Sequence, residues 1–215
     1  MSPKNLKSIS LFIPPFVVAL AIATTGCERA TNATPANSPV ASAPSTMEPK
    51  ATPTPEKTVA MKSSEFQKSA NATSKVDMGR VKAAVYFDPQ KWKLEKPEAG
   101  GRMELMHQDG EAFAMVISER LQLNLNNLRS IVLSNAKQAA PDAKIVGQEK
   151  RIVNGREVLF MRLRGTIEGI PFTYMGYYFT GKEGTIQVIT YTSENLLSEY
   201  QQDFEELLNG LTLKS

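Results

Sequence analysis

The sequence predicts an α+β domain in which an antiparallel β-sheet is covered by helices, an α/β/α sandwich. Three observations support this prediction. Short runs with strand-like alternation recur along the second half of the chain, tight-turn dipeptides separate several of them, and two segments carry the apolar spacing of amphipathic helices. Because consecutive hairpins pair neighbouring strands in opposite directions, the order favours an antiparallel sheet.

The predicted strands cover residues 81–87, 102–107, 112–119, 145–153, 158–167, 171–180 and 185–192. Asp109-Gly110 and Asn154-Gly155 each stand between two such runs. These dipeptides tolerate the positive φ angles of type I′ turns, so they predict two hairpins.

Two helices are predicted, over residues 123–139 and 193–208, because apolar residues recur there at three- and four-residue spacing. Pro141 ends the first helix, whereas Ser193 caps the start of the second and Gly210 stops it. Both stripes need an apolar surface, and the sheet supplies one for each.

The strand over residues 171–180 is aromatic on both sides. Alternation sends Tyr174 and Tyr178 to one face, and Met175, Tyr177 and Phe179 to the other. Either set could be core or partner surface. If both are core, both faces of the sheet are covered.

The first 27 residues resemble the signal peptide of bacterial lipoproteins. Lys4 and Lys7 precede an apolar run of about 15 residues, shorter than the roughly 20 that span a membrane. The run ends in Ala-Thr-Thr-Gly-Cys, and the resemblance implies a diacylglycerol on Cys27. Cleavage after Ala23 is the alternative, and it would give a soluble secreted product.

Residues 28–76 are rich in Pro, Ala, Thr and Ser and contain little apolar bulk. Such a segment cannot offset its ordering entropy, so a disordered linker is expected, with a typical span of roughly 40 Å if it is a coil. The folded domain is then predicted over residues 77–215.

Composition excludes several function classes. From Lys75 onward the chain has 18 basic and 18 acidic residues, which argues against a nucleic-acid partner. One cysteine and one histidine leave little material for disulfides or metal sites. Neither a nucleophile elbow nor a phosphate-binding glycine loop is present, so we expect a protein that is not an enzyme and that uses no cofactor.

Four arginines are the candidate partner-binding residues: Arg151, Arg156, Arg162 and Arg164 cluster across the Asn154-Gly155 hairpin. They could bind an anionic partner or lipid headgroups, or form the solvated side of a sheet.

Acidic residues form two other groups in the sequence. His107 with Asp109, Glu111 and Glu119 is a weaker metal candidate, and no metal site is predicted. The acids Glu199, Asp203, Glu205 and Glu206 are expected to be a solvated helix face, because adjacent helix residues do not face each other.

The domain resembles the PsbP-like superfamily, which includes the extrinsic photosystem II subunit of plants and cyanobacterial lipoprotein relatives. The matching pieces are Tyr86-Phe87-Asp88-Pro89 with Trp92-Lys93-Leu94, the segment 152–158, and the stretch 174–191 leading into 204–208. The resemblance implies a PsbP-like fold and a role in binding or assembly. It carries over no metal or partner site.

These observations predict a membrane-tethered, non-enzymatic accessory or assembly lipoprotein that binds an envelope or thylakoid-lumen protein. It would face the periplasm, or the thylakoid lumen in a photosynthetic cell. The alternative is a periplasmic domain that binds a small ligand or a metal.

Overall fold

The computed structural model describes residues 65–95 and 102–213. Its strands are β1 (Glu65–Phe66), β2 (Ser74–Met78), β3 (Ala83–Phe87), β4 (Trp92–Leu94), β5 (Arg102–His107), β6 (Phe113–Glu119), β7 (Lys144–Val153), β8 (Arg156–Ile167), β9 (Ile170–Gly181), β10 (Gly184–Ser193) and β11 (Leu211–Leu213). The helices are α1 (Leu125–Ala139), α2 (Leu197–Leu208) and a 3₁₀ turn, η1 (Glu194–Leu196).

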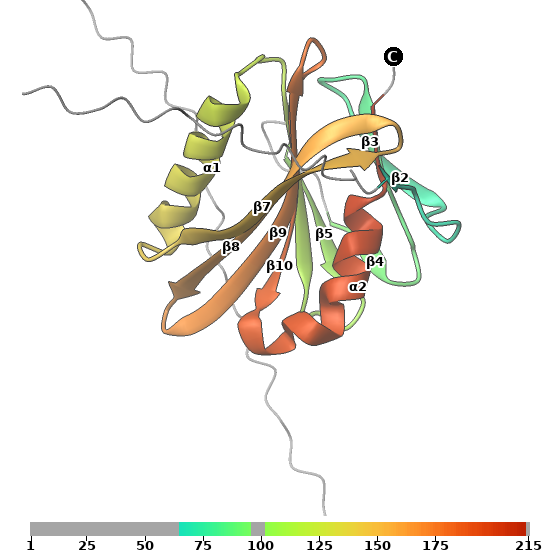
Figure 1. Cartoon of the computed structure of the whole chain (residues 1–215). Coiled ribbons are helices and arrows are strands. Elements are labelled where there is room, and N and C mark those ends of the chain that lie inside the picture. Colours follow the sequence, from blue (N-terminus) through green and yellow to red (C-terminus); the bar gives the residue numbers. More distant parts are fainter. Residues whose placement is uncertain (1–64, 96–101, 214–215) are drawn as a thin grey trace, which may run out of the picture. The chain divides into compact units, whose positions relative to one another are not determined.

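The strands of the described residues form two sheets (Figure 1). The larger has the order β1-β7-β8-β9-β10-β6-β5-β4, and the smaller the order β11-β3-β2. Neighbours in both sheets are antiparallel, except that β1 runs parallel to β7. The long central strands β7 to β10 therefore form a continuous meander, as the consecutive hairpins predicted.

The predicted hairpins are present, but their turns differ. Asn154 and Gly155 have φ angles of 46° and 76°, which a type I′ turn requires. At Asp109-Gly110 only Gly110 has positive φ, so the prediction of a type I′ turn is wrong there. The Asp109 carboxylate instead accepts the backbone N–H of Glu111 and shapes a longer loop.

A third tight turn joins β8 to β9 at Glu168-Gly169, with φ angles of 50° and 82°. Glutamate rarely adopts positive φ, so only Gly169 of these two residues indicates a tight turn in the sequence. The short loop holds the register that sets Arg162 against Met175 and Arg164 against Thr173.

Each face of the large sheet has its own core. Leu128 and Val132 of α1 pack with Leu163, Tyr174 and Tyr178 on one face. On the other face, α2 and the small sheet pack on residues that include Met175, Tyr177 and Phe179. The predicted alternation of β9 is confirmed, and both aromatic sets are core.

The α+β class is correct, but the predicted α/β/α sandwich is wrong, because neither face carries a layer of helices. A single helix lies on the first face, and the small sheet shares the second face with α2 (Figure 1). β11 was not predicted from the sequence, since Gly210 indicates only the end of α2. Gly210 also accepts the Tyr86 N–H (2.9 Å), which begins the pairing of β11 with β3.

The segment predicted as linker includes ordered strands. β1 and β2 start before residue 77, and β2 buries Val76 and Met78 to 3% and 1% exposure against β3. Cys27, the signal peptide and the rest of the linker lie outside the described residues. None of the helices in the described ranges is long and apolar enough to span a membrane.

Candidate functional site

The four candidate arginines lie on one face of the large sheet, the face that carries α2. Arg156, Arg162 and Arg164 are separated by even steps along β8, so their side chains point to the same side. Arg151 on β7 is paired with Val158 of β8, which belongs to the core beneath α2. We call this side of β7, β8 and β9 the arginine face.

The side chain of Arg151 is largely buried and makes its contacts inside the domain. Its guanidinium carbon lies 3.9 Å from the Phe160 ring centroid and 4.8 Å from that of Phe66. It donates to the Tyr177 hydroxyl (3.2 Å) and to Glu149. Burial lowers the pKa of Arg151, but its bonds to Tyr177 and Glu149 raise that pKa by more, so the side chain stays charged. With 12% of its side chain exposed, it links β1, β7 and β9.

Arg156 is likewise used inside the molecule. It donates to the Glu183 carboxylate at 2.7 Å and lies over the Phe179 ring, 5.6 Å from its centroid. Burial raises the pKa of Glu183, but bonds from its own backbone and from Arg156 outweigh burial, and the net shift is downward. The pair joins the start of β8 to the β9–β10 turn.

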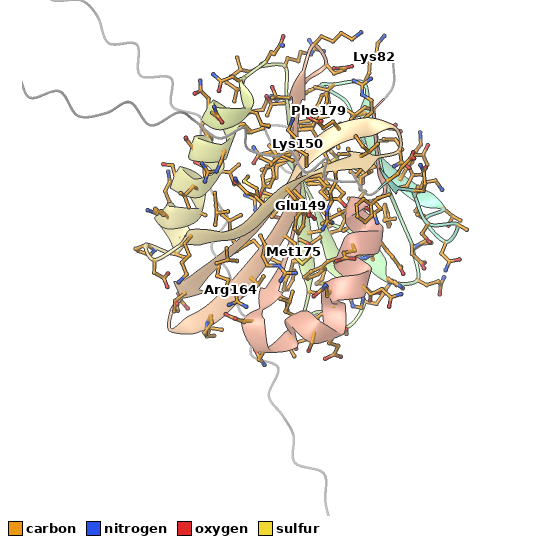
Figure 2. All side chains as sticks on the ribbon, in the orientation of Figure 1. Lys82, Glu149, Lys150, Arg164, Met175 and Phe179 are labelled. Atoms are coloured by element: carbon orange, nitrogen blue, oxygen red, sulfur yellow. The ribbon has the colours of Figure 1, made fainter. Side chains whose placement is uncertain are left out.

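Arg162 and Arg164 are candidate arginines whose N–H donors are not all bound by acceptors of the described residues. Arg164 pairs with Glu194 of η1 at 2.8 Å, and its Nε is buried without a hydrogen-bond partner among the described residues. Within the described part of the chain, Arg162 donates only to the Met175 sulfur, at 3.9 Å, and has no carboxylate partner. Figure 2 shows Arg164 and Met175 on the strands beside α2.

The cross-strand neighbours of these two arginines complete a small patch. Thr173 is opposite Arg164 on β9, is fully buried, and has no hydrogen-bond partner for its hydroxyl among the described residues. On β7, Gly147 is opposite Arg162 and contributes no side chain. We call Arg162, Arg164, Thr173, Met175 and Gly147 the docking patch. Sequence reasoning missed Thr173 and Gly147, because only the register places them there.

His107 and Asp109, two of the residues considered as metal ligands, belong to a network of ion pairs and hydrogen bonds with α2. The two ring nitrogens of His107 lie 2.9 Å from Asp109 and 3.2 Å from Asp203. Lys91 bridges Asp203 and Glu206, and Tyr200 donates to Asp109. No three potential metal ligands converge within residues 65–95 and 102–213.

The remaining candidate acids lie apart from this network or are held by other side chains. Glu119 is at the opposite end of β6 from the His107 hairpin, and Glu111 is exposed. On α2, Glu205 accepts from Gln201, whereas Asp203 and Glu206 are held by Lys91. The ammonium group of Lys91 supplies the positive charge that two neighbouring carboxylates need.

A separate hollow of about 240 Å³ lies between α1 and β7, where Asn126 and Arg129 face Gln148 and Lys150. It is smaller than the roughly 300–1,000 Å³ of ordinary ligand pockets. It does not include the candidate arginines.

No protein-family profile matches the chain, and no curated protein is significantly similar to it in sequence. Among solved structures, cyanobacterial PsbP (CyanoP) from Synechocystis sp. PCC 6803 is similar, with a TM-score of 0.51 and 9% identity, covering 66% of this chain and 92% of that chain.

Two further solved structures are more distant. The Ran-binding protein Mog1p of Saccharomyces cerevisiae has a TM-score of 0.45 and 6% identity, covering 65% of this chain and 94% of that chain. LpqN of Mycobacterium tuberculosis, involved in cell envelope biogenesis, has a TM-score of 0.38 and 8% identity, covering 62% and 83%. At these TM-scores neither adds to the argument. The similarity to CyanoP shows that this chain has a PsbP-like fold.

Proposed function

We propose that the protein is a membrane-tethered, non-enzymatic accessory or assembly lipoprotein that docks on a protein partner through the docking patch. The observation that carries the proposal is Arg162, a half-buried arginine on the sheet face with no carboxylate partner in the described chain. No nitrogen of Arg162 is among the buried, unpartnered atoms of the described residues, so the donors that Met175 does not use are open to solvent and can bind a partner.

The contrast with the other arginines supports this assignment. Arg151 and Arg156 are held by aromatic rings and by Glu149 and Glu183, so their charge serves the fold. Arginine is also the charged residue most enriched at the centres of protein interfaces. The docking patch is thus the part of the arginine face that is left for a partner.

The tether is the second half of the proposal and rests on sequence. The segment ending at Gly26-Cys27 resembles a lipobox, and residues 28–64 are rich in Pro, Ala and Thr. We propose that a lipid on Cys27 holds the domain near an envelope or thylakoid membrane, where its partner resides.

Docking is tested by site-specific photo-crosslinking in the cells that make the protein. A photoreactive amino acid replaces Lys144, which is exposed and lies opposite Arg164, in one variant and Arg129, on α1, in the control. We expect one discrete membrane-derived adduct at position 144 and none at position 129. Equal labelling at both positions, or none at position 144, would contradict docking through the patch.

The anchor is tested with Cys27→Ser. The wild-type protein should incorporate labelled palmitate and sediment with membranes, whereas the variant should do neither. A variant that stays in the membrane fraction, together with an unlabelled wild type, would reject the lipid anchor without touching the docking proposal.

A further inference from the structure

We propose that the docking patch recognises a single carboxylate, an Asp or Glu side chain of the partner protein, with Arg162 as its principal ligand. This inference rests on the proposed function and names the chemistry of the partner. Three features of the patch carry it: the free donors of Arg162, the carboxylate that Arg164 already binds, and the charge balance of the face.

Arg162 has donors without acceptors. A guanidinium carries five N–H groups in a planar fork, and a carboxylate accepts two of them at once. The contact of Arg162 with the Met175 sulfur, at 3.9 Å, uses one donor on a weak acceptor. Gly147 adds no side chain beside Arg162, so β7 does not close the approach from that side.

Glu194 shows how a carboxylate binds on this face. It reaches from η1 to Arg164 at 2.8 Å, with 43% of the Arg164 side chain and 35% of the Glu194 side chain exposed. An ion pair this exposed contributes little stability, so a partner carboxylate can displace Glu194 at low cost. Displacement would also free Arg164, whose Nε and neighbour Thr173 lack partners in the described chain.

The charges around Arg162 favour an acidic ligand. Glu149 pairs with Arg151 and Glu194 with Arg164, whereas Arg162 and Lys144, which lies opposite Arg164 on β7, form no salt bridge among the described residues. A partner carboxylate complements this surplus of positive charge. The floor beneath Arg162 is apolar, with Met175 fully buried and Phe160 at 7% exposure, as suits an amino-acid side chain.

The test measures binding of a rhodamine-labelled, end-blocked hexaglutamate peptide to the full chain, purified in nonionic detergent, by fluorescence anisotropy. Arg162→Gln should weaken binding by about tenfold to a hundredfold, the usual worth of a charged hydrogen-bonded pair. Arg162→Lys should fall between, because an ammonium cannot bind both carboxylate oxygens in a fork. Arg129→Gln, which removes the same charge from α1, should leave the Kd within about twofold.

Two variants separate this site from general attraction to acid. Glu194→Gln removes the competing carboxylate and should tighten binding several-fold. Gly147→Leu keeps every charge and should weaken binding, because a side chain at position 147 first meets Arg162, with its Cβ 3.9 Å from that of Arg162. Circular dichroism of each variant checks that the fold is retained.

The inference is overturned if wild type does not bind hexaglutamate, if Arg162→Gln and Arg129→Gln behave alike, or if Glu194→Gln weakens binding. Binding to phosphatidylglycerol vesicles that hexaglutamate does not displace would identify a lipid-binding face instead. A partner adduct at position 144 that Glu194→Gln leaves unchanged would also reject the carboxylate, while leaving the docking proposal intact.

Discussion

At the residue scale, arginines on one face of the sheet serve two different purposes. Arg151 sits among Phe66, Phe160 and Tyr177 and holds the interior together, whereas Arg162 lies over Met175 without an anionic partner in the described chain. The sequence shows four equivalent arginines, because their roles depend on what lies opposite each one across the sheet.

Arg151→Met should therefore lower the free energy of unfolding by about 1–3 kcal/mol, through loss of the cation–π contacts and of the bond to Tyr177. Arg162→Gln should change it by less than about 0.5 kcal/mol. Urea denaturation of both variants measures the difference. Equal destabilisation would mean that Arg162 also serves the fold.

Gly210 is a residue whose role depends on close approach rather than on φ. A Cβ at this position would lie 1.9 Å from the Tyr86 carbonyl oxygen, a backbone atom that cannot move aside cheaply. Gly210→Ala should cost more than about 3 kcal/mol and separate β11 from β3. Gly79→Ala, where a Cβ meets nothing within 4 Å, should stay within about 0.5 kcal/mol. Thermal unfolding compares the two; similar melting temperatures would contradict the steric argument.

At the element scale, a polar network joins the β5–β6 hairpin to α2. Tyr200 of α2 donates to Asp109 at 2.5 Å, and Asp203 contacts His107, whose ring packs edge-on against Trp92. The sequence presented Asp109 as a turn residue and His107 as a metal candidate. Only the packing of α2 on the sheet reveals that both residues fix the position of the helix.

This network predicts a pH dependence of stability. Burial raises the pKa of Asp109, but hydrogen bonds from Tyr200, the Glu111 backbone and His107 lower it by more, so its folded pKa lies below 3.8. The stabilisation is present above the unfolded pKa, about 4, and is lost as pH falls through the folded value. Tyr200→Phe should cost about 1–2 kcal/mol at pH 7 and less at pH 2, as measured by urea denaturation at both pH values. A cost independent of pH would exclude Asp109 as the group responsible.

At the scale of the whole molecule, the sequence predicted the large meander but not the second sheet. Strands β7 to β10 are long, rich in apolar residues and separated by short turns with glycine in or beside them, so local pattern alone indicates them. The small sheet is built from β2, β3 and β11, which come from opposite ends of the described chain, and its edge strands have only five and three residues. Only part of the docking patch could be predicted, for the same reason. Its arginines were identified from the sequence, whereas Thr173 and Gly147 lie beside them only because of the strand register.

The start of the domain is the feature in which the structure departs most from the sequence-based prediction, and it can be tested by truncation. A chain that begins at residue 77 lacks β1 and most of β2, and therefore loses Val76, the Phe66 ring over Arg151, and the bond from the Asn154 N–H to the Phe66 carbonyl. Each buried apolar side chain contributes about 1.5–3 kcal/mol, and domains of this size retain only about 5–15 kcal/mol in all.

A chain covering residues 65–215 should therefore unfold cooperatively, with a melting temperature close to that of the full protein. The chain covering residues 77–215 should melt many degrees lower or fail to fold, because β3 loses most of β2, one of its two antiparallel partners. Differential scanning calorimetry of the three proteins makes the comparison. If the 77–215 chain were as stable as the 65–215 chain, β1 and β2 would not be needed for the fold. The domain boundary predicted from the sequence, at residue 77, would then be correct.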